Sequence, residues 1–217
     1  VQRQVADQAG VQTPGMGGGD IFHEPVLVVN QKAKLIEINN EYAVYDQNGN
    51  QIAAVRQVGQ SKLKKVLRVV SNVDQFMTHN FQIVDMSGNI RLTITRPRKI
   101  MKSRVEVADG AGRAIGSVVQ KNVIGKINFD LIAGGTSVGS INAENWRAWN
   151  FSIRDSAGTE VARITKTWEG LAKTMFTTAD NYVLQIHQPL QEPLRSLVVA
   201  SALSVDTALM QVDRGFN

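Results

Sequence analysis

The sequence predicts a mainly β protein whose many short strands close into a barrel or stack as a sandwich. Three observations predict this fold. Turns of the form Asp-x-x-Gly recur along the chain, apolar residues alternate with polar ones on both sides of each turn, and further alternating segments lie between the repeats. Alternation with a period of two is typical of strands with one buried face. A sheet with this many strands closes or stacks because open edges aggregate.

The repeated unit is a predicted β-hairpin. Asp opens a tight turn by accepting hydrogen bonds from its own downstream backbone, and Gly supplies a positive φ at the end of the turn. Calcium loops are the alternative interpretation, but they need more carboxylates at fixed spacing. The turn interpretation is therefore favoured. The four repeats are centred on Asp46, Asp85, Asp109 and Asp155.

Other alternating segments raise the expected number of strands to about twelve or thirteen, a size at which sheets usually close or split. The Gly-rich segment 134–139 has no Lys and no helical pattern after it, so we interpret it as a turn or bulge. Residues 1–21 are polar and Gly-rich and predict a flexible tail, with a single domain over 22–217. The additional strand candidates are Val26–Val29, Leu35–Ile38, Val66–Val70, Ile127–Leu131 and Tyr182–Ile186.

The segment 194–210 follows Pro193 and has no helix breaker. As a helix it would be roughly 25 Å long, shorter than the ~30 Å hydrocarbon core of a membrane. It also contains Asp206, which would be costly in lipid. Length and charge favour a buried core helix over a membrane span. Its predicted core residues are Leu194, Leu197, Val198, Leu203, Val205 and Leu209.

The composition offers no catalytic constellation. The chain has no Cys, which excludes disulfides and thiolate chemistry, and its His residues at 23, 79 and 187 have no metal-ligand spacing. No nucleophile elbow, phosphate-binding loop or dinucleotide fingerprint is present. We therefore predict a protein that is not an enzyme, and an enzyme of unknown type would need a pocket with convergent polar groups.

Basic residues gather in two segments, 61–68 and 96–104, in a chain with a formal net charge of +5. Such clusters attract anionic lipid head groups or phosphate backbones, and otherwise form solvated loops. Nucleic acid is disfavoured because no aromatic residues are interleaved for stacking. The candidate head-group ligands are Lys62, Lys64, Lys65, Arg68, Arg96, Arg98, Lys99, Lys102 and Arg104.

The C-terminal third resembles the phospholipid scramblase family. Its elements stand in the family's order: Lys166-Thr-Trp168-Glu-Gly170, then Ala179-Asp-Asn-Tyr182, then a strand and an apolar helix. The hairpins extend the resemblance over roughly 22–214, and tubby-like and plant LURP-one-related proteins share this architecture. The resemblance implies a twelve-stranded barrel wrapped around the C-terminal helix.

The resemblance also implies a cytoplasmic, peripherally membrane-associated protein that binds phospholipids or helps to translocate them. The family segment proposed to bind calcium begins at the position of Asp180, which makes Asp180 and Asn181 the candidate calcium ligands. No cofactor is predicted to be required. The alternative function is a soluble protein-interaction module with the same fold and no lipid activity.

Overall fold

The computed structural model describes residues 19–30, 40–58, 78–97, 103–122, 125–144, 150–167 and 181–204. Within them the chain forms twelve antiparallel strands and one helix, labelled α4. The strands are β1 (Val26–Asn30), β2 (Asn40–Tyr45), β3 (Gln51–Val58), β4 (His79–Asp85), β5 (Ile90–Arg96), β6 (Arg104–Asp109), β7 (Ala114–Gln120), β8 (Asn128–Ala133), β9 (Thr136–Ala143), β10 (Asn150–Asp155), β11 (Glu160–Thr167) and β12 (Asn181–Ile186), and α4 spans Leu194–Ser204.

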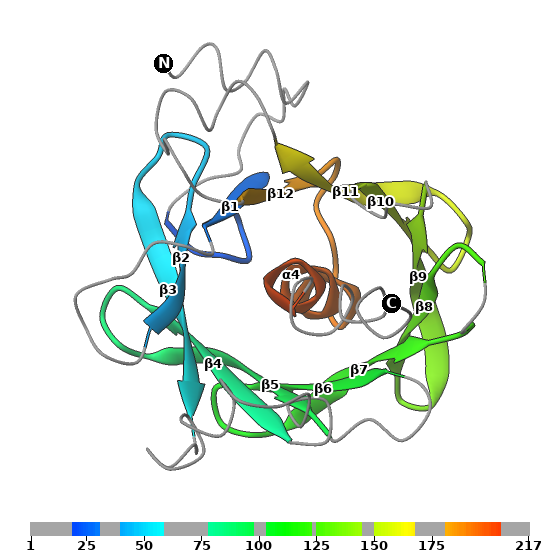
Figure 1. Cartoon of the computed structure of the whole chain (residues 1–217), viewed down its shortest axis with the longest axis horizontal. Coiled ribbons are helices and arrows are strands. Elements are labelled where there is room, and N and C mark those ends of the chain that lie inside the picture. The colour runs from blue at the N-terminus through cyan, green and yellow to red at the C-terminus, as the bar shows by residue number, and fades with distance from the viewer. Residues whose placement is uncertain are drawn as a thin grey trace, which may run out of the picture.

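The strands pair in sequence order, and the last strand closes the barrel on the first. In that closing pair Val28 of β1 lies opposite Val183 of β12, and Val28 also lies opposite Tyr45 of β2. Figure 1 shows the resulting ring with α4 in its middle. The prediction of a closed, mainly β barrel of about twelve strands around a C-terminal helix is confirmed.

The hairpin turns form as their residues predict. Asp46 Oδ1 accepts the N–H groups of Asn48 and Asn50, both at 2.8 Å, and Gly49 has a φ of 82°. The same bonds recur after Asp85, Asp109 and Asp155. These carboxylates are thus engaged in holding the turns closed.

The hydrogen bonds of the turns lower the pKa of two of these carboxyl groups. The Asn89 side-chain amide has the largest effect on the pKa of Asp85, and the backbone N–H of Arg113 has the largest effect on that of Asp109. A carboxylate that accepts such bonds is favoured over the neutral acid.

The Gly-rich segment 134–139 is interpreted from the sequence as a turn or bulge, but only its first two residues form the turn. Gly134 and Gly135 make the turn with φ values of 56° and 80°, but β9 begins at the next residue, Thr136. Val138 and Ile141 face or approach the core from this strand. The predicted strands Leu35–Ile38 and Val66–Val70 lie outside the described residues.

Helix α4 is buried because the barrel surrounds it. Leu197, Val198, Val199 and Ala200 are all 0% exposed, so consecutive positions around the helix are covered. Leu203 is also buried, and Leu194 is half-buried against the core. Val205 and Leu209 lie outside the described residues. A helix that is apolar on all sides belongs in such an interior.

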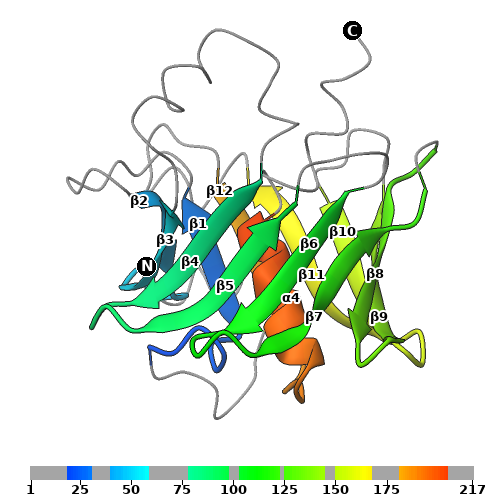
Figure 2. The same cartoon turned by 90° about the horizontal axis from the view of Figure 1, so that it is seen from below.

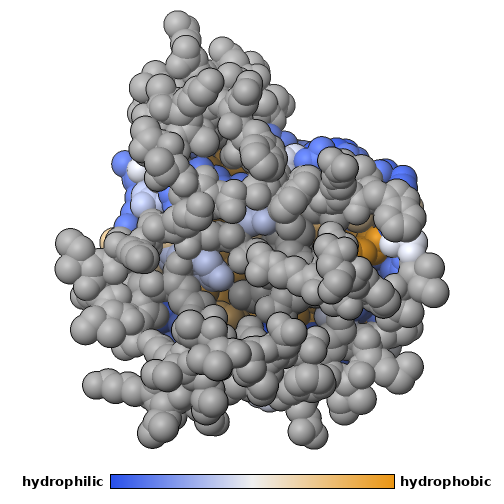
Figure 3. All heavy atoms as spheres, viewed as in Figure 1, coloured by the Kyte–Doolittle hydropathy of each residue, from blue (hydrophilic) through white to orange (hydrophobic). Residues whose placement is uncertain are grey.

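The core also includes residues before β1. Ile21 is 2% exposed and packs into the main cluster, so the folded part includes Ile21. Every residue of β1 is buried, on both faces of the sheet. Where described residues are visible in Figure 3, hydrophilic ones line the outer edge over β10 and β11, and hydrophobic ones lie within the ring.

Candidate functional site

The two ends of the barrel differ in kind. The Asp-x-x-Gly turns and the start of α4 lie at one end, which we call the turn end. At the other, the connection end, β3 ends at Val58, β4 begins at His79, and α4 ends at Ser204. Figure 2 shows the hairpin turns along the lower end and the opposite strand ends along the upper one.

The topology attaches both basic segments to the connection end. Segment 61–68 belongs to the connection from β3 to β4, and segment 96–104 spans the connection from β5 to β6. Both connections leave from and return to this end, and only the β4–β5 hairpin separates them. Two stretches of positive charge that are about thirty residues apart in sequence are therefore joined to neighbouring parts of one rim.

Two of the predicted head-group ligands are described, and they lie in different surroundings. Arg104 opens β6, has a 55% exposed side chain and forms an ion pair with Glu106. Arg96 ends β5 and is only 7% exposed, opposite His79 of β4. Arg96 thus belongs to the barrel wall and offers little surface to a head group. The other candidates, Lys62, Lys64, Lys65, Arg68, Arg98, Lys99 and Lys102, lie outside the described residues.

The inner wall becomes polar toward the connection end. His79 continues the inward alternation of Phe81 and Ile83, stacks on Phe81 with centroids 6.3 Å apart, and lies 2.8 Å from the Gln57 amide through Nδ1. Gln120 is 1% exposed. We call the buried or half-buried inward residues Gln57, His79, Arg96, Ser103 and Gln120 the polar collar.

Hydrogen bonds hold the second half of the collar in place. Gln120 Oε1 accepts the N–H of Ser103 at 3.0 Å, and Gln120 Nε2 donates to the carbonyl of Asn122 at 2.7 Å. The reasoning from sequence missed the collar. Extending the period-two alternation of each strand by one more inward position would have found it.

Of the two predicted calcium ligands, only Asn181 lies within the described residues. Asn181 opens β12 between Asn30 and Thr167 of the neighbouring strands and is 1% exposed. Its amide oxygen and nitrogen have no hydrogen-bond partner in the part of the chain that the structure describes. Among the described residues no group of three or more acidic, His or Cys side chains could hold a metal ion. Asp180 lies outside those residues, so the calcium site stays a prediction.

The chain is similar to a yeast protein and to a solved plant structure. The Altered inheritance rate of mitochondria protein 25 of Saccharomyces cerevisiae is 24% identical over 234 residues, which cover 86% of this chain and 70% of the yeast protein. A solved structure of an Arabidopsis thaliana protein aligns over 84% of this chain and 96% of that one, with 14% identity and a TM-score of 0.48.

In the described part of the chain, no helix combines the length and the hydropathy needed to cross a bilayer. The family model described as Scramblase matches residues 19–211, which include every strand of the barrel and the described helix. The chain belongs to the scramblase family.

Proposed function

We propose that the protein is a non-catalytic, peripheral membrane protein that binds anionic phospholipid surfaces through the connection end of its barrel. The observation that carries the proposal is the attachment of both basic segments to this one end. Family membership supports a lipid-related role. Each basic residue near an anionic membrane contributes about 1 kcal/mol of attraction.

The proposal is for binding, without a path for lipid through the barrel. The interior around α4 is filled by apolar side chains such as Leu92, Leu131 and Ile153, all 0% exposed. A charged head group that crossed this core would lose its hydration without gaining partners. The polar collar lines the inside of the barrel only near the connection end. This is the end of the barrel that would face a membrane surface.

Co-sedimentation with vesicles tests the proposal. The full chain is mixed with neutral or anionic vesicles at low and at high salt. We expect binding to anionic vesicles alone, weakened by salt because exposed charges are screened over about 8 Å at physiological ionic strength. Equal binding to neutral vesicles, or no binding to any vesicle, would overturn the proposal.

Matched double variants identify the end that binds. Lys64→Gln with Arg98→Gln removes two charges from the basic segments. Arg113→Gln with Arg154→Gln removes two from exposed arginines at the turn end, whose side chains are 83% and 46% exposed.

The first pair should weaken binding by about 30-fold, the equivalent of ~2 kcal/mol. The second pair should leave binding almost unchanged. Adding Lys62→Gln and Lys65→Gln to the first pair should abolish it. Equal losses in the two double variants would indicate a diffuse charge effect and contradict the assignment.

A further inference from the structure

A pocket of about 500 Å³ opens at the turn end, between the first turn of α4 and strands β5 and β7. This volume lies within the range of about 300–1,000 Å³ that is usual for sites of small molecules. The pocket is at the opposite end of the barrel from the basic segments. It therefore lies outside the proposed membrane surface and needs its own explanation.

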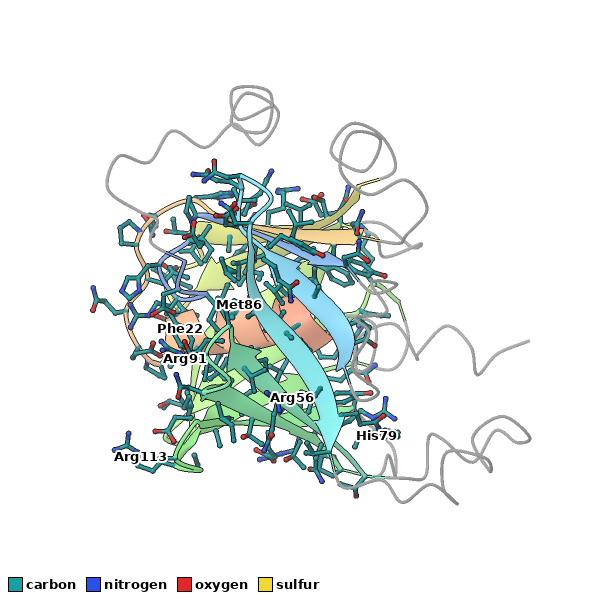
Figure 4. All side chains as sticks on the ribbon, turned by 90° about the vertical axis from the view of Figure 1, so that its left-hand side faces the viewer. Phe22, Arg56, His79, Met86, Arg91 and Arg113 are labelled. Atoms are coloured by element: carbon teal, nitrogen blue, oxygen red, sulfur yellow. The ribbon has the colours of Figure 1, made fainter. Side chains whose placement is uncertain are left out.

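Two arginines flank an aromatic ring at the pocket. The Arg91 guanidinium carbon lies 5.4 Å from the Phe22 ring centroid, and that of Arg195 lies 5.8 Å from it. Both distances fall within the range of a cation–π contact. Figure 4 shows Phe22 and Arg91 close together at the turn end, far from His79. Stacking on Phe22 restricts both guanidinium groups before any ligand arrives.

The charged groups that line the pocket balance one another. Arg91 and Arg195 contribute two positive charges, and Asp109 and Glu192 contribute two negative ones. A ligand with one charge would be attracted by one pair and repelled by the other. A ligand that carries both charges can meet one member of each pair, which favours a zwitterion.

The existing contacts indicate which groups would meet each charge. Arg195 donates through Nε to Glu192 Oε1 at 2.8 Å, which is its one side-chain hydrogen bond among the described residues and leaves its two terminal nitrogens for an anion. The Glu192 side chain is 45% exposed, so one face of its carboxylate can meet a cation. Arg91 and Asp109 are already engaged: Arg91 Nη2 donates to Asp20 Oδ2 at 2.8 Å, and Asp109 accepts from Ala111 and Arg113 of its own turn.

The floor of the pocket is apolar. Leu92 is 0% exposed and belongs to the core, Ile115 packs against that core, and Ala114 and Pro193 complete this side of the lining. Burying an apolar group here would gain about 25 cal/mol for each Å² removed from water. The pocket thus offers an apolar floor beneath a balanced set of charges.

We propose that this pocket binds a small amphiphile with a zwitterionic head and an apolar body. The anionic part of the head lies at the terminal nitrogens of Arg195, the cationic part at Glu192, and the body on Ile115, Ala114 and Pro193. A zwitterionic lipid with one chain and a free apolar amino acid share this chemistry. The site is separate from the proposed membrane surface, so both can be occupied at once.

Titration calorimetry with a matched ligand series tests the charge requirement on the full chain. Three probes carry the same short alkyl chain, each below its critical micelle concentration: an alkylphosphocholine, an alkyl phosphate and an alkyltrimethylammonium. Leucine is the fourth probe. We expect the phosphocholine, leucine or both to bind at least about tenfold more tightly than the single-charge probes. Each single-charge probe can meet only Arg195 or only Glu192, not both.

Which zwitterion binds distinguishes a lipid from an amino acid as the source. No binding by either zwitterion, or a single-charge probe that binds equally well, would overturn the proposal.

Variants test the location of the site. Arg195→Gln should weaken binding of the zwitterion by about 10- to 100-fold, because a hydrogen bond to a charged group is lost. Ala114→Leu fills the pocket from an exposed position and should also abolish binding without unfolding the barrel. Arg154→Gln, an arginine outside the lining, is the matched control and should bind normally.

Thermal melting shows whether each variant is folded. If both pocket variants fold and still bind the zwitterion, the pocket is not the site. Both should retain vesicle binding, which keeps this test independent of the proposed membrane surface.

Discussion

Gly116 of β7 lies so close to α4 that a Cβ atom built on it would be 3.3 Å from Cδ1 of Leu197. The same Cβ would also collide with the carbonyl of Ile132 on the neighbouring strand. The absence of a side chain at this position allows helix and wall to approach each other. Gly139 of β9 is a second close approach, because a Cβ there would be 3.1 Å from Cδ1 of Leu194 on the helix.

Gly116→Ala should lower the free energy of unfolding by about 1–3 kcal/mol, the usual cost of overpacking. Urea denaturation measures the change. Ser87→Ala is the control, because it is a similarly small change of side chain at an exposed turn residue. A Gly116→Ala variant as stable as the original would mean that the wall yields easily at this point.

Val199→Asp should unfold the protein or cost it about 4 kcal/mol or more, because Val199 is 0% exposed within the barrel. Circular dichroism during heating measures the loss. Val199→Thr is a milder polar substitution at the same position and should cost about 1–3 kcal/mol. Met86→Asp introduces the same charge at a residue that is 63% exposed and should be tolerated. Tolerance of Asp at position 199 would mean that the helix is not part of the folded core.

Asn181→Leu should leave stability unchanged or raise it by up to about 3 kcal/mol. Asn181 is 1% exposed and its amide has no hydrogen-bond partner within the described part of the chain, so its desolvation is uncompensated there. Asn122→Leu is the matched control: Asn122 donates to the Lys126 carbonyl at 2.7 Å and accepts the N–H of Asn128 at 2.9 Å, and its loss should destabilise the protein. Equal destabilisation by both changes would show that Asn181 has a partner in solution.

Stability should fall in acid as the turn carboxylates are protonated. The pKa values of Asp85 and Asp109 are lowered in the fold, so their contribution is fully present above the unfolded value of about 3.9. It is lost as the pH falls from there through the folded pKa. The double variant Asp85→Asn with Asp109→Asn should show a shallower decline below about pH 4 in pH-dependent denaturation. An unaltered decline would assign acid sensitivity to other groups.

Local chemistry explains which parts of the fold could be predicted. An Asp–Gly turn is specified by residues adjacent in sequence, so the hairpin at Asp46 was predictable. Strand β9 was not, because its Gly and Ser residues favour turns, and it becomes a strand through its pairing with Phe129 of β8 and Phe151 of β10. Pairing between strands overrides such weak local preferences.

The sites were predictable to different degrees. The positive charge of the basic segments is visible in the sequence, but their attachment to one rim follows only from the topology. The burial of Arg96 follows from alternation with Leu92 and Ile94 in the same strand. The pocket has no local signature, because Phe22, Arg91 and Arg195 come from three distant parts of the chain.

The pairing of β1 with β12 determines when the barrel can be completed. During synthesis Val28 emerges long before Val183, its partner in the closing pair, and α4 follows later still. Until then the outer edges of both β1 and β11 and the apolar lining of the sheet stay open, a state that invites aggregation and slow folding. A nascent chain of this protein therefore has to be protected until its final strand and helix have left the ribosome.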